Sequence, residues 1–187
     1  MNRNAAAAPF PLDPAAVLVA GLKGLARRGW RELLIFVGVT TSLCTSWKVE
    51  ILKAIHDFTL GNDVFKMALF KAQAALTGTY GASTTNYSDM TGNGDEIPNG
   101  AGYTTGGVAL ANTTPISSGT TGFTTPSAAA QWTAATFTTR AAMYYNSSKA
   151  NRCVFVYDFG ADEPVVSGTL TLNMPANDNT HALLRIA

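Results

Sequence analysis

The stretch WTAATFTTRAAMYYNSSKANRCVFVYDFG (residues 132–160) consists of two segments of alternating polar and apolar side chains around a polar turn, NSSKAN (residues 146–151). Because successive side chains of a strand point to opposite faces, this alternation predicts two β-strands. One face of each strand would carry Phe137, Thr139, Ala141, Met143 and Tyr145 in the first, and Cys153, Phe155, Tyr157 and Phe159 in the second. The stretch therefore predicts a β-hairpin, and it contains no grouping of side chains that indicates catalysis.

Similar strand patterns occur on both sides of this hairpin. They comprise residues 64–70 (VFKMALF), residues 106–114 (GGVALANTT), residues 167–174 and the C-terminal ALLRIA. In the last of these we expect Leu184 and Ile186 to point inward and Arg185 outward. Several short strands separated by turn signals favour a mainly β, β-sandwich-like domain over an α/β enzyme.

The segment TSWKVEILKAIHDF (residues 45–58) has apolar residues at helical spacing. It predicts one short amphipathic helix, with Val49, Leu52 and His56 on one face and a cap from Thr45 or Ser46. Residues 77–125 are instead rich in Gly, Thr, Ser and Asn, with single apolar residues between turn signals. This second pattern predicts short strands joined by long loops.

The first part of the chain differs in composition from the rest. It is rich in Ala, Leu and Arg, whereas the remainder is rich in Thr and Gly. We therefore divide the chain into an N-terminal extension, residues 1–44, and a β-rich body, residues 45–187. The extension is compatible with a helical arm from about residue 15 to residue 39, with a targeting-like segment, or with translation from a start codon upstream of the true one. Its apolar run, residues 33–39, is too short for a bilayer span of about 20 residues.

The charge of the chain is low and nearly balanced. Charged residues make up 13% of the sequence, the residues AVILMFWYC make up 47%, and the formal net charge is +1. Residues 61–187 carry eight acidic and six basic side chains. Such a composition is typical neither of a disordered chain nor of a nucleic-acid binder. We expect no nucleic-acid partner, and no membrane partner for residues 45–187.

The two cysteines, Cys44 and Cys153, lie far apart in the sequence. Neither belongs to a CxxC motif or to the Cys/His spacing of zinc sites. Two free thiols are the simpler interpretation, and a disulfide is the alternative.

The histidines do not form a recognisable site. His56 and His181 are the only two, and neither has a second His or a Cys at ligand spacing. Although His56 precedes Asp57, we interpret it as a helix-end residue rather than as half of a catalytic dyad.

The acidic residues also fail the spacing tests. DMTGNGDE (residues 89–96) partly resembles an EF-hand loop, but Thr91 occupies its third position and Gly100 stands where a bidentate Glu is needed. Asp162 and Glu163 are neighbours in a turn and should point apart, whereas glycosidase acids face each other. We predict no catalytic residue, no metal site and no cofactor, and the sequence leaves any binding residues unknown.

A series of motifs carries a family resemblance: KVEILKAIHDF, FKMALFKAQAAL, TTNYSDM with DEIPNGAGYTTGG, WTAATFTTRAAMYYNSS, CVFVYDFG and a terminal LLRIA. In this order they resemble a group of small structural proteins of tailed-bacteriophage virions, over roughly residues 45–187. The resemblance implies a non-enzymatic virion component, such as a head-decoration, neck or tail accessory subunit. Its partners would be capsid or tail subunits and further copies of itself in a homo-oligomer. Residues 1–44 depart from the pattern, and the group defines no site residues to transfer.

A different function class is a glycan- or receptor-binding module. Such a module would present exposed aromatic rings, with Trp132 and Tyr103 as the candidates, beside Asn or Asp in the loops. A hydrolase is a third hypothesis, and the sequence offers no residues for it.

Overall fold

The computed structural model describes residues 37–187. The predictions for residues 1–36, which include most of the extension, lie outside the described residues. Two short strands precede Thr45: β1 (Gly38–Val39) pairs in parallel with β4 (Thr79–Tyr80), and β2 (Ser42–Leu43) pairs with the second strand of the long hairpin. The predicted helical arm therefore does not extend to residue 39.

The predicted hairpin is confirmed, and it is longer than its sequence pattern indicated. Strands β8 (Ala130–Asn146) and β9 (Arg152–Leu172) run antiparallel on either side of the turn. The strand predicted separately over residues 167–174 is largely the end of β9. Pro164 lies within β9, beyond the residues of β9 that pair with β2, so its missing N–H removes no bond on that side.

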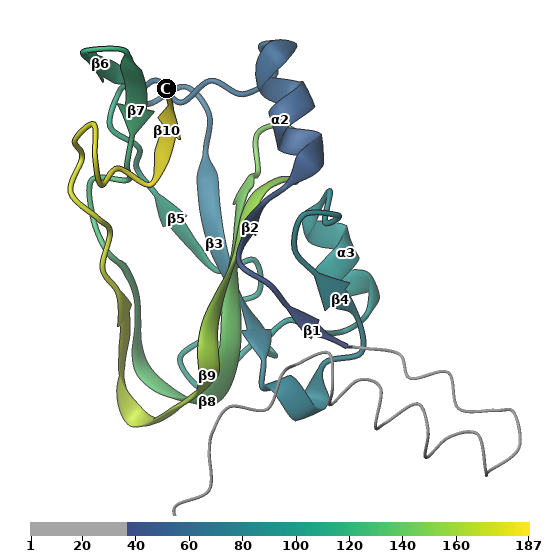
Figure 1. Ribbon diagram of the computed structural model, residues 1–187. Helices are drawn as coiled ribbons and strands as arrows, with labels where there is room; N and C mark the ends of the chain where they lie inside the picture. Colours follow the sequence, from purple (N-terminus) through teal and green to yellow (C-terminus); the bar gives the residue numbers. More distant parts are fainter. Residues whose placement is uncertain (1–36) are drawn as a thin grey trace, which may run out of the picture. The chain divides into compact units, whose positions relative to one another are not determined.

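The hairpin bends at a bulge, where β9 has more residues than β8 between two successive paired positions. Thr139 pairs with Glu163 and Ala141 pairs with Asp158, so residues 159–162 stand opposite Arg140 alone. Gly160 has a φ of 84°, which favours glycine. An extra segment of this kind increases local bending, and the outer part of the hairpin curls away from the rest of the sheet (Figure 1).

The hairpin is the centre of a five-stranded sheet with the order β2-β9-β8-β3-β5, in which all neighbours are antiparallel. Strand β3 (Phe65–Lys71) agrees with its prediction, and β5 (Val108–Leu110) lies in the segment predicted as most strand-like. Phe65, Leu69 and Phe70 are fully buried, so both faces of β3 are covered. The mainly β prediction is confirmed.

A second sheet of three strands has the order β10-β7-β6 and contains β6 (Ile116–Ser118), β7 (Thr121–Thr124) and β10 (Leu184–Ile186). In Figure 1 it lies to the left of β3, and the helices lie to the right. Leu184 is buried as predicted, but Ile186 is exposed. The inward prediction for Ile186 is wrong: it shares a face with Leu184, but it stands at the end of β10 opposite Gly122, which has no side chain, and the body does not cover it.

The predicted helix is shorter than residues 45–58. Helix α2 (Thr45–Leu52) ends just before Ala54, whose φ of 51° is incompatible with a right-handed helix. Its N-cap residue is Cys44, and no side chain caps the helix, so the predicted Thr45 or Ser46 cap is wrong. The three residues predicted on one face do not share an environment: Val49 and Leu52 are exposed, whereas His56, beyond the end of α2, is buried. The buried residues of α2 itself are Trp47 and Glu50.

A second helix, α3 (Tyr87–Gly92), was missed by the sequence analysis, as was the 3-10 helix η1 (Gln73–Ala75). A capping box begins α3: Asn86 accepts a hydrogen bond from the Ser88 N–H, and Asp89 accepts one from the Asn86 N–H. This reciprocal pattern was readable in the sequence NYSD as a helix start.

The loop before β5 runs close against β3. Gly107 has a φ of 71°, and a Cβ built on it would lie 1.8 Å from the carbonyl oxygen of Met67. Only glycine therefore permits this approach. Among the described residues no helix is long and apolar enough to cross a membrane.

Candidate functional site

The carboxylate of Asp95 is fully buried. It holds together the Gly- and Thr-rich residues 77–107, which we call the polar segment. It accepts hydrogen bonds from the N–H groups of Thr77 (2.9 Å) and Gly78 (2.8 Å) and from the Tyr80 hydroxyl (2.6 Å). Burial, followed by the bond to Asp95, raises the pKa of Tyr80 well above its usual range. The phenol therefore remains a donor, and the Asp95 carboxylate has its lone pairs occupied by the protein itself.

The neighbouring carboxylate, Glu96, has a similar role. It accepts hydrogen bonds from the hydroxyls of Tyr87 (2.5 Å) and Tyr103 (2.7 Å) and from the N–H of Gly106 (2.7 Å). Burial is the main reason that the pKa values of both phenols lie far above the ordinary value. Glu96 thereby connects α3, the following loop and the approach to β5.

The EF-hand-like stretch does not converge on a cation. The Asp89 carboxylate accepts from the Thr85 N–H (2.7 Å) and the Asn86 N–H at the start of α3, while Asp95 points to different donors. Within residues 37–187 no group of three or more His, Cys, Asp or Glu side chains could hold a metal ion.

His56 belongs to a buried polar cluster rather than to a dyad with Asp57. Its Nε2 lies 2.8 Å from Glu50 Oε2, and its Nδ1 lies 3.0 Å from the amide nitrogen of Asn146. Because an amide nitrogen only donates, Nδ1 accepts and Nε2 donates to Glu50. Arg152 binds the other oxygen of Glu50 at 2.5 Å. The His56 side chain has no exposed surface, so this cluster fastens α2 to the hairpin turn and offers no base to a substrate.

The remaining predicted candidates are also separate from one another. Asp57 is exposed, and hydrogen bonds from Thr59 and Asn62 lower its pKa. His181 pairs with Asp178 at 2.9 Å on the surface, and that contact lowers the pKa of Asp178 below its usual range.

Asp162 and Glu163 do not form a facing pair of acids either. Asp162 accepts from the Gln73 N–H at 2.8 Å, and Glu163 is exposed in β9. Both residues lie within β9, at its bend, so the turn predicted for them is wrong.

The aromatic residues considered for glycan binding are buried. Trp132 and Tyr103 are each 2% exposed, and their ring centroids lie 6.5 Å apart. Tyr144 and Tyr145 are equally buried. The hypothesis that Trp132 and Tyr103 form an exposed platform is therefore wrong: the alternation at the start of β8 turns Trp132 into the core, and Tyr103, from the loop between α3 and β5, is buried near it.

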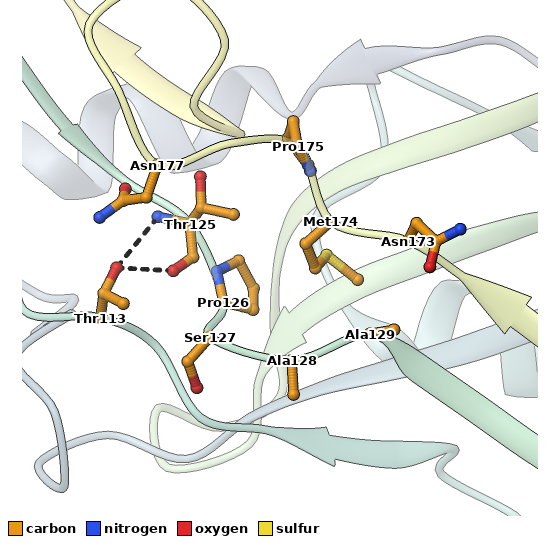
Figure 2. Close-up of a pocket in the computed structure, with 10 residues that line it drawn as sticks. All are labelled: Thr113, Thr125, Pro126, Ser127, Ala128, Ala129, Asn173, Met174, Pro175 and Asn177. Atoms are coloured by element: carbon orange, nitrogen blue, oxygen red, sulfur yellow. Dashed lines mark hydrogen bonds between the residues drawn. The ribbon is translucent and has the colours of Figure 1, made fainter.

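A pocket of about 380 Å³ lies between the start of β8 and the end of β9 (Figure 2). It is lined by Thr113, Thr125, Pro126, Ser127, Ala128, Ala129, Asn173, Met174, Pro175 and Asn177. Thr113 donates its hydroxyl proton to the Thr125 carbonyl at 2.7 Å, and Ser127 donates to Ala111. None of these described lining residues is ionisable or aromatic, so the pocket supplies no acid, base or stacking surface.

The surface with the clearest binding chemistry is a group of large apolar side chains that solvent reaches. We call it the apolar end; it comprises Val49, Leu52, Leu60, Val64, Ile116 and Ile186. The first two lie on α2, the next two on the connection to β3, and the last two on the three-stranded sheet. Figure 1 shows α2, β6 and the C-terminal strand at the same end of the described body.

One hydrogen bond joins the two parts of the apolar end. The Leu60 N–H donates to the Thr114 hydroxyl at 3.2 Å, which ties the connection after α2 to the segment before β6. Leu52 is 88% exposed, the largest value among the exposed large apolar residues. These side chains lie on elements at one end of the body, and contiguous exposed apolar patches are typical of protein–protein contact surfaces. The sequence analysis missed this surface because it predicted Ile186 to point inward and treated Val49 and Leu52 only as one face of an amphipathic helix.

No family model, curated protein or solved structure matches the chain.

Proposed function

We propose that the chain is a non-enzymatic structural protein of a bacteriophage virion, a multi-copy head-decoration or head/tail accessory subunit that acts by protein–protein adhesion. The observation that carries the proposal is the apolar end, and the motif resemblance over residues 45–187 supplies the setting. The partners are capsid or tail subunits and further copies of this chain.

The physical basis is the transfer of exposed apolar surface out of water. Full burial of one Leu or Ile side chain contributes roughly 1.5–3 kcal/mol. Leu52, Ile116 and Ile186 are each more than half exposed, so a complementary particle surface would gain from covering all three. Binding of many symmetric copies, with about 1,600 Å² buried in each contact, would hold without a single strong interaction.

The use of the polar groups supports adhesion over chemistry. Hydrogen bonds from groups inside the body occupy the carboxylates of Asp95, Glu96 and Glu50, and the His56 ring is buried. A subunit whose task is to dock gains rigidity from such internal bonds.

The first test is peptide mass spectrometry on nuclease-treated particles of the phage whose genome encodes the chain. Trypsin releases residues 141–149 (AAMYYNSSK) from the hairpin. Recovery at a level comparable to the major capsid subunit supports decoration, and a few copies per particle support a neck or tail position. Absence of the peptide from the particles contradicts the proposal.

The second test compares the two most exposed large apolar residues of the described chain. Leu52 lies in the apolar end and is 88% exposed, whereas Val166 lies on the outer part of the hairpin and is 78% exposed. In binding of the full chain to particles that lack it, we expect Leu52→Gln to weaken affinity roughly tenfold or more, from the lost burial of one side chain. The matched control, Val166→Gln, should bind as the wild type does. Equal binding by both variants would exclude the apolar end as the docking surface.

A further inference from the structure

The two cysteines, which are 109 residues apart in the sequence, meet in the core. Their Sγ atoms lie 2.7 Å apart, and neither residue has exposed surface. Cys44 follows β2, and its N–H donates to the Val154 carbonyl at 3.0 Å. This bond places Cys44 beside the residue that follows Cys153 in β9.

Two sulfur atoms that are not bonded to each other stay farther apart than this, outside the sum of their van der Waals radii. A disulfide has a bond length of about 2.05 Å, so the two atoms need to approach by only about 0.65 Å from the observed 2.7 Å. The backbone pairing of Leu43 with Phe155 already holds the two chain segments together. The geometry therefore suits a covalent bond better than two separate thiols.

We propose that Cys44 and Cys153 form a reversible intramolecular disulfide by exchange with a low-molecular-weight disulfide such as oxidised glutathione. One protein thiol loses its proton and attacks a sulfur of the small disulfide, which releases one small thiolate and leaves a mixed disulfide. The second protein thiolate attacks the protein sulfur of that mixed disulfide and releases the other small thiolate. Two protein thiols become one disulfide, and the small disulfide takes up the two electrons and the two protons.

Burial controls when this exchange takes place. Burial is the main cause that raises the pKa of the Cys153 thiol well above its usual range, followed by its contact with Cys44. Because the thiolate is the reacting species, the closed body reacts slowly. Exchange requires the short β2 pairing, Ser42–Leu43 with β9, to open, or it takes place before the core closes. The same burial protects the finished disulfide from reductants.

The disulfide would clamp the segment before α2 to the central hairpin. Closing so long a loop restricts the unfolded chain strongly. For a protein of this size the expected rise in Tm is roughly 10 °C.

The test uses the full chain, equilibrated with glutathione and glutathione disulfide over a range of ratios, then alkylated with iodoacetamide in denaturant. Trypsin places Cys44 in residues 32–48 and Cys153 in residues 153–185. We expect these two peptides to appear linked, in a monomer that has lost the mass of two hydrogen atoms. Alkylation of both cysteines at every ratio, or only intermolecular or glutathione-bound products, would overturn the proposal.

Thermal unfolding supplies a second readout. The wild type should melt at a higher temperature when oxidised than when reduced, and the difference should vanish in Cys44→Ala and in Cys153→Ala. The comparison within the wild type needs no variant, so it stands even where a variant folds poorly. The same Tm for the oxidised and the reduced wild type would overturn the clamping role.

Discussion

The long hairpin and the segment of residues 77–107 are both ordered parts of one body, yet they are held by different interactions. The inner part of the hairpin is stabilised by fully buried side chains such as Met143, Tyr144 and Val154. The second segment is organised around the carboxylates of Asp95 and Glu96, which bind backbone N–H groups and phenols. The comparison shows that a Gly- and Thr-rich segment with only a few buried apolar side chains, such as Met90 and Ile97, can be ordered by buried carboxylates, and that its order then depends on a few hydrogen bonds.

The largest expected effect is in the hairpin. Tyr144 is fully buried, and its ring lies 5.4 Å from Phe65 and 5.2 Å from Phe155 between centroids. Tyr144→Ala should lower the free energy of unfolding by about 4 kcal/mol, since it removes a large buried ring and leaves a cavity. Chemical denaturation of the two proteins measures this difference. A loss below about 1 kcal/mol would mean that the hairpin is not the main source of stability.

Tyr144→Phe is the matched control for the ring. It keeps the aromatic contacts and removes only the hydroxyl, which donates to the Asn112 side chain at 2.5 Å. The expected loss is about 1–2 kcal/mol because Asn112 is left without its donor. A Phe variant as unstable as the Ala variant would assign the effect to the hydrogen bond.

An intermediate effect is expected in the polar segment. In Asp95→Asn, an NH₂ group replaces one acceptor oxygen among the N–H donors of Thr77 and Gly78. We expect a loss of about 1.5–3 kcal/mol, the range for hydrogen bonds to a charged group. Hydrogen exchange should also become faster at the amides of Thr77 and Gly78, with little change in the hairpin.

Asp162→Asn is the control for this second prediction. Asp162 accepts one bond, from Gln73, and is exposed, so its change should cost at most a few tenths of a kcal/mol. Unchanged exchange at Thr77 and Gly78 in Asp95→Asn would contradict the view that the carboxylate orders this segment.

The smallest effect concerns the charge pair at the hairpin bend. Burial by itself raises the pKa of Asp158, but the hydrogen bonds from Arg140 and from the Gly160 N–H outweigh it, and the net pKa lies below 3.8. A carboxyl group whose pKa is lower in the folded state stabilises the protein at pH values above its pKa in the unfolded state. This contribution is lost as the pH falls through its pKa in the folded state. We expect the free energy of unfolding of the wild type to exceed that of Asp158→Asn by about 1 kcal/mol at pH 7, and this difference to shrink below about pH 4. Urea denaturation at several pH values measures it, and a difference independent of pH would exclude the ion pair as its cause.

The quality of the sequence predictions follows the kind of interaction that holds each region. The positions of β8, β9 and β3 are predicted correctly because runs of alternating, β-branched and aromatic residues between turn signals are typical of strands. Their buried faces are not, since residues 141–146 are all buried, Val154 and Val156 are fully buried, and Tyr157 is 48% exposed. The face of α2 is predicted wrongly because Glu50, an acidic residue, is buried against His56 and Arg152. Helical periodicity of apolar residues cannot register a buried charge whose partners lie on other elements.

The candidate surface was less predictable than the fold. Exposure of Leu52 and Ile186 depends on what neighbouring elements fail to cover, which is a property of the assembled body. The departure of residues 89–96 from an EF-hand loop could be read from Thr91 and Gly100, while the donors that occupy Asp95 come from residues 77–80 and required the structure.

By itself the sequence determined the mainly β class, the central hairpin with its turn, strand β3 and the lack of a spaced catalytic motif, because each of these depends on local pattern and residue type. The tertiary structure alone decided that Asp95 and Glu96 are structural, that Trp132 is buried, that six apolar side chains face solvent at one end, and that Cys44 meets Cys153. These are contacts between residues far apart in the chain, and they depend on the order and bending of the strands, which no local pattern encodes.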